Sequence, residues 1–204
     1  MKKYLIIVDI QNDFTQEEGS LFVKGSDKAI TAINEIINNN NFYDKIIATQ
    51  DWHSRNHISF AETHNKKPFV DTIETSYGIQ ALWPNHCVQG TWGSDLDPRL
   101  NSDKIDIILR KGTKENLDSY SAFIENDKKT STELEFLFKH MPEFQIDICG
   151  VATDVCVYNT VKDCKAIFPE AKIRLFLPGC AAVFPEKLEN ILEELSKLNI
   201  ILVK

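Results

Sequence analysis

Short apolar runs alternate along the chain with stretches in which apolar residues recur every three or four positions. The first run, at residues 4–8, is nearly continuous, which is typical of a strand that is buried on both faces of a sheet. Comparable runs predict further strands at residues 45–49, 105–109, 144–150, 172–177 and 200–203.

The helical spacing is clearest after residue 26, where apolar side chains follow the i, i+3, i+4, i+7 pattern. Ser26 is the predicted N-cap of this helix, and the asparagine-rich residues 38–41 are predicted to end it. Similar spacing predicts helices over residues 132–140, 154–167 and 188–198. Strands and helices that alternate in this way predict an α/β fold with a parallel sheet and right-handed crossovers.

Residues 54–104 show no convincing regular element. A segment of that length is unusual inside a compact domain and tends to be functional. No internal repeat, low-complexity tract or linker divides the sequence, so we expect a single domain over residues 1–204.

The composition narrows the classes of function. Apolar residues make up 43% of the chain, which predicts a folded globule, and the net charge is −7. Nucleic acids and anionic membranes both need a basic surface, so neither is an expected partner. The five cysteines include no Cys-x-x-Cys pair, and the apolar start is too short for a signal peptide or a membrane span. We therefore expect free thiols in a reducing, cytoplasmic location.

The turn after residues 144–150 holds the candidate nucleophile. With Thr153 as the predicted N-cap of the next helix, Cys156 falls at the third helical position. The free amides and the dipole of the first turn should lower the pKa of a thiol there and favour the reactive thiolate. The alternative is that Cys156 is a small buried apolar side chain, which is common for cysteine.

Polar residues follow the other predicted strands and could complete such a site. Ligands in open α/β sheets bind beyond the carboxyl ends of the strands, where Asp9, Lys111 and Cys156 should meet. A carboxylate can take the proton of a nearby thiol, and an ammonium keeps that carboxylate ionised. The three residues therefore predict a nucleophile, a base and an orienting group.

A second group of residues has the composition of a metal site. Asp51 and His53 are two positions apart on an extended segment, so their side chains point the same way, and His86 is the best third candidate. One carboxylate and two imidazoles suit zinc or iron(II) and leave positions open. We interpret His57, His64 and His140 as ordinary polar loop or surface residues.

Together these segments resemble the nicotinamidase/pyrazinamidase branch of the isochorismatase-like cysteine hydrolases. The resemblance covers nearly the whole chain, and the metal-containing branch is marked by the segments around residues 51–53 and 83–87. The matching segments are DIQNDF at 9–14, DWH at 51–53, HISF at 57–60, WPNHCVQGT at 83–91, KGT at 111–113, YSAF at 120–123 and GVATDVCV at 150–157.

The resemblance implies a Rossmann-like three-layer α-β-α fold with a six-stranded, mostly parallel sheet. It implies that nicotinamide is hydrolysed to nicotinate and ammonia through a cysteine thioester, as in NAD salvage. The implied site residues are the catalytic Asp9, Lys111 and Cys156, the substrate-binding Phe14, Trp83 and Ala152, and the metal ligands Asp51, His53 and His86.

Further properties implied by the resemblance leave alternatives open. The metal is usually zinc, with Fe²⁺ or Mn²⁺ possible, and a further ligand could come from Ser59, Glu62 or His57. The bond between Val151 and Ala152 is cis in the family, and the amides of Ala152 and Cys156 would form an oxyanion hole. A homo-oligomer is possible, since family members range from monomers to tetramers.

Two other functions compete with this one. Another amidase, or an isochorismatase of the same superfamily, would share the cysteine site but generally lacks the metal ligands. A non-catalytic metal- or nucleotide-binding module is the alternative from a different class. It is disfavoured because the strand ends carry no Gly-x-Gly-x-x-Gly motif or phosphate loop.

Overall fold

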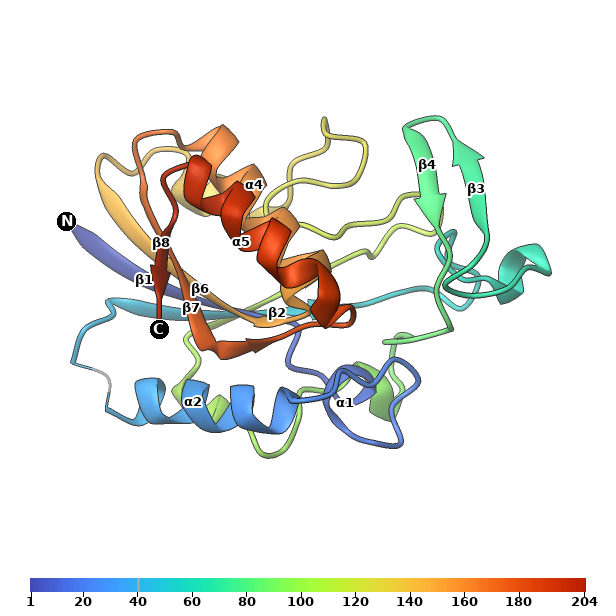
Figure 1. Cartoon of the computed structure of the whole chain (residues 1–204), viewed down its shortest axis with the longest axis horizontal. Coiled ribbons are helices and arrows are strands. Elements are labelled where there is room, and N and C mark those ends of the chain that lie inside the picture. The colour runs from blue at the N-terminus through green and yellow to red at the C-terminus, as the bar shows by residue number, and fades with distance from the viewer. Residues whose placement is uncertain (40) are drawn as a thin grey trace.

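The computed structural model describes residues 1–39 and 41–204, and its centre is a six-stranded sheet (Figure 1). The strands lie in the order β5-β2-β1-β6-β7-β8, and every neighbouring pair is parallel. This confirms the predicted α/β class and the parallel sheet. The strands are β1 (Lys2–Val8), β2 (Lys45–Asp51), β5 (Ile107–Lys111), β6 (Phe144–Val151), β7 (Lys172–Ala181) and β8 (Ile201–Val203).

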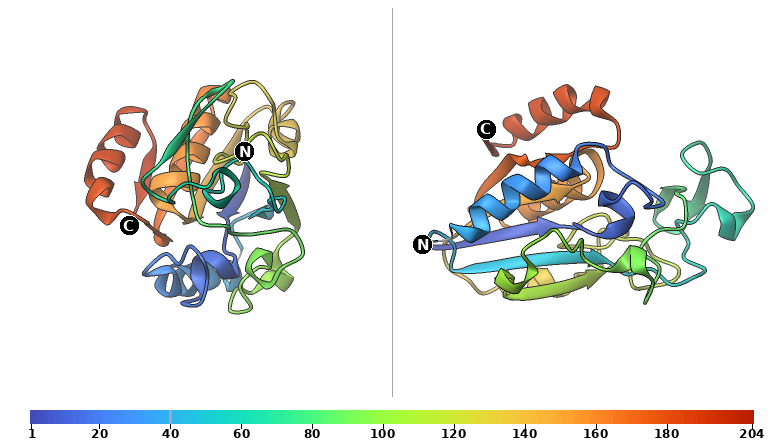
Figure 2. Two further views of the ribbon diagram at one scale, coloured as in Figure 1. Left: turned by 90° about the vertical axis from the view of Figure 1, so that its right-hand side faces the viewer. Right: turned by 90° about the horizontal axis from the view of Figure 1, so that it is seen from below.

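Helices cover both faces of the sheet and form a three-layer arrangement. Figures 1 and 2 show α2 on one side of the strands and α4 and α5 on the other. The helices are α1 (Asn12–Thr15), α2 (Ser26–Asn38), α3 (Glu133–Phe138), α4 (Tyr158–Ile167) and α5 (Leu188–Lys197). Across residues 1–39 and 41–204, none of the helices is long and apolar enough to cross a bilayer.

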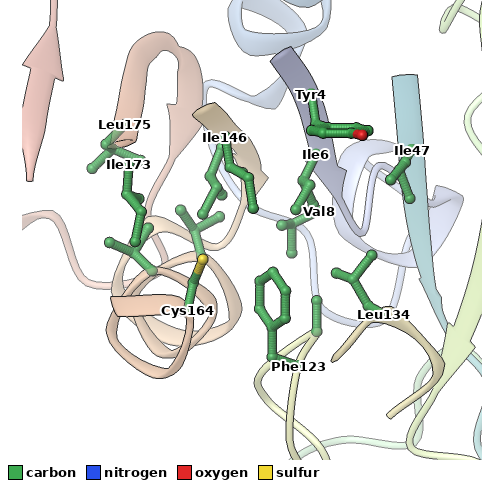
Figure 3. Packing of buried hydrophobic residues seen from close by; sticks show 14 of the residues in the cluster. Tyr4, Ile6, Val8, Ile47, Phe123, Leu134, Ile146, Cys164, Ile173 and Leu175 are labelled. Atoms are coloured by element: carbon green, nitrogen blue, oxygen red, sulfur yellow. The ribbon is translucent and has the colours of Figure 1, made fainter. Parts of the chain in front are cut away.

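The continuous apolar runs arise because the central strands are buried on both faces. Along β1, the side chains of Tyr4, Ile6 and Val8 enter one core cluster, and those of Leu5 and Ile7 enter the other. Figure 3 shows part of the first cluster, to which the helices α3, α4 and α5 also contribute buried side chains. Successive side chains of a strand point to opposite faces, so a strand between two helical layers must be apolar at every position.

Ile6 tests the importance of this central strand. It is fully buried, and we expect Ile6→Ala to lower the free energy of unfolding by about 2–5 kcal/mol, because it leaves a cavity in a close-packed core. Urea unfolding at equilibrium measures this loss. Ile108→Ala, on the edge strand β5 and 47% exposed, should change stability by about 0.5 kcal/mol or less. Equal losses in the two variants would contradict the assignment of the core.

Two predicted helix starts are wrong in detail. Ser26 is the first residue of α2 rather than its cap, and Gly25 precedes it with a φ of 92°. Thr153 does not cap α4, because residues Thr153–Val157 form a π-helical turn with Ala152 at its N-cap position. The first helix is predicted to end over residues 38–41, and α2 ends at Asn38; residue 40 of that segment lies outside the described residues.

The segment between β2 and β5 contains regular structure that the sequence pattern did not predict. An antiparallel hairpin of β3 (Thr72–Thr75) and β4 (Gly78–Ala81) projects from the end of the sheet that carries the turn after β1 (Figure 1). Each of its strands has four residues, and most of their side chains face solvent. Such short and exposed strands give no apolar alternation, which is why the pattern predicted only irregular chain.

Candidate active site

Three strands bring the candidate nucleophile and its partners together. Asp9 follows β1, Lys111 ends β5, and Cys156 lies in the turn after β6. Strands β1 and β6 are in register to their ends, where Val8 pairs with Gly150. Gly150 has a φ of 120°, and a Cβ there would overlap the backbone of Val8. Glycine is therefore required for the close approach that places the turn beside Asp9.

Lys111 is the centre of the charged part of the site. Its Nζ lies 2.9 Å from Asp9 Oδ2 and 2.5 Å from Asp51 Oδ1, and it donates to the carbonyl oxygen of Ser119 at 3.0 Å. The same Nζ is 3.6 Å from Cys156 Sγ. Because Lys111 is 4% exposed, one buried ammonium is shared by two carboxylates and a thiol.

Burial and charge set the protonation of this group. Burial raises the pKa of Asp9 to about 6, although the ammonium of Lys111 opposes the shift. Burial also disfavours the charged form of Lys111, but Asp51 and Asp9 outweigh it and hold its pKa well above the ordinary value. Lys111 is therefore a cation at neutral pH, and it supports the ionised form of Asp9.

The pKa of Cys156 corrects the prediction that the helix start makes it an easily ionised thiol. Its side chain is 7% exposed, and burial raises its pKa well above that of a free cysteine. The ammonium of Lys111 lowers this pKa and the carboxylate of Asp9 raises it further. Burial removes water from the full negative charge of a thiolate, whereas the amides of the turn offer only partial positive charges, so the effect of burial on the pKa is the larger one. The resting group is a thiol, so its reactivity requires a neighbouring base.

The three predicted metal ligands meet beside this group. Asp51 ends β2, and its Oδ2 lies 3.5 Å from His53 Nε2 and 3.9 Å from His86 Nε2. One ligand atom from each of the three residues lies within 4.8 Å of the others. All three side chains are buried.

Hydrogen bonds orient both imidazoles toward Asp51. His53 Nδ1 is 2.9 Å from the carbonyl oxygen of Gly112, and His86 Nδ1 is 2.7 Å from that of Pro84. A carbonyl accepts a proton from Nδ1 and leaves the Nε2 lone pair free, which is the usual arrangement of a metal-binding histidine. Gly112 has a φ of 60°, and a Cβ there would overlap the His53 ring.

The charges of this cluster suit a divalent cation. Burial, reinforced by His53, lowers the pKa of His86 to about 4, so its imidazole is neutral at physiological pH. Burial opposes the ionised form of Asp51, but Lys111 and the histidines outweigh it and keep its pKa below the ordinary range. Burial also lowers the pKa of His53, but the carboxylate of Asp51 outweighs this effect and raises it, so the cluster attracts positive charge and a metal ion would displace the proton of His53. One anionic and two imidazole donors therefore fit a divalent metal.

The candidates for a further ligand lie in different surroundings. His57 is buried, so its interpretation as an ordinary polar loop or surface residue is wrong. Its ring centroid is 4.1 Å from that of His53, and its Nδ1 is 2.7 Å from Ser59 Oγ. Its Nε2 is buried and has no hydrogen-bond partner among the described residues. Glu62 is exposed and accepts a hydrogen bond from Asn85.

Apolar and aromatic side chains form the walls of a cavity over Cys156. Phe14, on α1, lies with its ring centroid 5.5 Å from that of His86. Trp83 precedes His86 in the chain, and Ala152 begins the turn that carries Cys156. The bond between Val151 and Ala152 is cis, as the resemblance implied. The lining residues are Phe14, Leu21, Asp51, His53, Trp83, His86, Asp118, Tyr120, Ala152, Val155, Cys156 and Val183.

Several polar residues of the site were missed in the sequence. Thr49 Oγ1 donates to Asp9 Oδ1 at 2.6 Å, and the side chain of Gln11 bonds both the amide and the carbonyl of Asp51. Thr49 is two positions before Asp51 on the same strand, so the two side chains point to the same face of the sheet, and this spacing could have indicated Thr49 as a site residue. Asp118 lines the cavity although the loop that carries it gives no periodic pattern.

Comparisons with known proteins agree with this geometry. The model of the isochorismatase domain matches residues 3–203. A nicotinamidase of Acinetobacter baylyi is 49% identical over 160 residues, covering 78% of this chain and 72% of that protein.

Three solved structures superpose on the fold. The Acinetobacter baumanii nicotinamidase/pyrazinamidase has a TM-score of 0.91 at 35% identity, covering 100% of this chain and 96% of that one. The yeast nicotinamidase bound to the inhibitor nicotinaldehyde has a TM-score of 0.89 at 30% identity, with 99% of each chain covered. The Pyrococcus horikoshii pyrazinamidase in complex with zinc has a TM-score of 0.78 at 31% identity, covering 100% and 99%.

Proposed function

Because the chain belongs to the isochorismatase family, we propose that it hydrolyses nicotinamide to nicotinate and ammonia at the cavity over Cys156. Its curated relative at 49% identity is a nicotinamidase, and a structural neighbour binds nicotinaldehyde in the same fold. The observation that supports the proposal most directly is that Cys156 lines one cavity together with Asp51, His53 and His86. Lys111 and Asp9 lie directly behind this cavity, with Lys111 Nζ next to both Cys156 Sγ and the carboxylate of Asp9. We take residues 1–204 as one hydrolase domain, since the sheet uses strands from the whole chain.

In the first step of the proposed mechanism, Cys156 is deprotonated as it attacks. Asp9 takes the proton from Sγ while Sγ forms a bond to the amide carbon, so that no free thiolate has to accumulate in the buried site. Lys111 holds the carboxylate of Asp9 and keeps it ionised before the transfer. The backbone amides of Ala152 and Cys156 donate to the oxygen that gains negative charge.

The second half returns the enzyme to its starting state. Asp9 gives its proton to the amide nitrogen, the carbon–nitrogen bond breaks, and ammonia leaves a thioester on Cys156. Asp9 then takes a proton from water while the hydroxyl attacks the thioester carbon. The Sγ–carbon bond breaks, Asp9 returns its proton to Sγ, and the released acid gives its own proton to ammonia, which leaves nicotinate and ammonium. Phe14 and Trp83 hold the aromatic ring, so that the carboxamide is placed over Sγ.

Asp51, His53 and His86 would hold one divalent metal ion, which we propose is zinc. A neighbour of the same fold was solved in complex with zinc, and the three donors fit that ion. A bound divalent cation supplies positive charge beside the substrate and can orient a ligand.

The test is an assay of the purified protein with nicotinamide, measuring ammonia and nicotinate together. We expect the two products in equal amounts at a turnover of about 1–10³ s⁻¹, the common range for enzymes. Isochorismate, a vinyl ether, should release no pyruvate under the same conditions. Pyruvate from isochorismate without ammonia from nicotinamide would assign the protein to another branch of the superfamily.

A further inference from the structure

Gln80 is the only side chain of the β3–β4 hairpin that is fully buried. It is 1% exposed, whereas its neighbour Ile79 is 77% exposed, and the other residues of both strands are exposed or only partly buried. Figure 1 shows the hairpin standing away from the central sheet. A two-stranded hairpin is marginally stable in water by itself, so its position depends on contacts at its base.

The carboxamide of Gln80 provides several of these contacts. The two hydrogens of its Nε2 are shared among three acceptors, Asp118 Oδ2, Tyr120 Oη and the carbonyl oxygen of Ala81, each 2.9 Å from the nitrogen. Its Oε1 accepts from the hydroxyl of Tyr77 at 3.2 Å. A carboxylate and a carbonyl can only accept, so the amide must present its nitrogen to them, and its orientation is determined.

The same hydrogen bonds extend to the wall of the active-site cavity. Tyr120 Oη, which accepts from Gln80, also accepts from Trp83 Nε1 at 3.0 Å. Asp118, Tyr120 and Trp83 all line the cavity that contains Cys156. Gln80 does not line this cavity, yet each of its polar partners Asp118 and Tyr120 does. Removing its amide would leave buried acceptors without their donor.

We infer that Gln80 is a positioning residue of the active site, which holds Trp83, Tyr120 and Asp118 in the conformation that binds the substrate ring. The inference rests on the proposed function for the identity of that substrate. Within the described residues Gln80 makes no hydrogen bond to Cys156 or Asp9, so it acts through the side chains that hold the substrate ring and not through the groups that transfer protons.

The first test is Gln80→Met, which keeps the length of the side chain and removes its hydrogen bonds. We expect KM for nicotinamide to rise about tenfold, with kcat within about twofold of wild type. The reason is that Trp83, Tyr120 and Asp118 would no longer be held in place by hydrogen bonds and would bind the substrate ring less tightly. Ile79→Ala, the adjacent exposed residue of the same strand, is the matched control and should leave both constants unchanged.

A paired substitution separates positioning from simple loss of folding. Gln80→Glu alone places a carboxylate against Asp118, and its KM should exceed that of Gln80→Met. Adding Asp118→Asn restores a donor and an acceptor between the two positions, and Tyr120 can donate its own proton to the introduced carboxylate. The double variant should therefore recover at least about threefold in KM relative to Gln80→Glu alone.

An NMR readout tests the network without relying on turnover. The indole N–H of Trp83 should shift in a ¹⁵N-labelled Gln80→Met sample, while those of Trp52 and Trp92 should not. Absence of ammonia from nicotinamide with wild type would refute the proposed function, but the indole shift would still test the network. The inference is overturned if KM and the Trp83 signal are unchanged in Gln80→Met. It is also overturned if the double variant shows no recovery over Gln80→Glu.

Discussion

Replacing Cys156 by alanine should abolish nicotinamide hydrolysis and leave the fold intact. In the proposed mechanism the Sγ atom forms the bond that replaces the amide bond, and no other thiol lines the cavity among the described residues. We expect kcat to fall by at least about 10³-fold, as is usual when a nucleophile is removed. Ammonia release measures the loss, and circular dichroism with metal analysis verifies that the protein is otherwise unchanged.

Cys164→Ala is the matched control for this substitution. Cys164 lies on α4 and is fully buried, and Figure 3 shows it within the apolar core among Ile146, Ile173 and Leu175. Its loss should cost about 1 kcal/mol of stability, because a small apolar side chain is removed from a packed core, and turnover should stay within about twofold. Turnover above a few per cent of wild type in Cys156→Ala would rule out the covalent route.

Replacing His86 by alanine should remove the metal and most of the activity. His86 comes from the loop after Trp83, so its loss breaks the ligand set while Asp51, at the end of β2, and His53, just after it, remain in place. We expect metal affinity to fall by at least about 100-fold, since even residues that only support a ligand change it by 10–100-fold. Mass spectrometry of the metal content after dialysis against a chelator measures this directly.

His140→Ala controls for the loss of an imidazole elsewhere. His140 is exposed and lies after α3, away from the cluster, so metal content and turnover should match the wild type. Treating the wild type with a chelator should lower activity as His86→Ala does, and adding Zn²⁺ should restore only the wild type. Full turnover by a protein shown to be free of metal would refute the requirement for an ion.

The fold and the meeting of the candidate site residues could be predicted because both follow from short-range rules. Apolar runs of residues 4–8 and 144–150 indicated strands buried on both faces, and the structure contains them as β1 and β6. In a parallel sheet the carboxyl ends of all strands lie at one edge, so residues such as Asp9 and Lys111 that follow different strands must gather there. Distance along the chain does not matter for this convergence.

The errors at Cys156 and His57 have a common origin in contacts between distant residues. The pKa of Cys156 was expected to be low from its place in a turn, but it depends on how much chain covers the thiol and on which charges lie nearby. His57 was expected in an ordinary loop or on the surface, yet it packs against His53 because its loop returns to the sheet edge. The burial and the charge around a side chain depend on many residues from distant parts of the chain, and a local sequence pattern does not include those residues.

The amino-acid sequence by itself determined which residue types the strands carry to the edge of the sheet: a thiol, an acid, an amine and a carboxylate with imidazoles. Only the tertiary structure decided how Lys111 divides its charge between Asp9 and Asp51, and how Gln80 of an exposed hairpin bonds to the wall around Trp83. The physical reason is that periodicity reports which face of an element is buried. Desolvation and hydrogen bonding depend instead on atoms that approach within a few ångströms from anywhere in the chain.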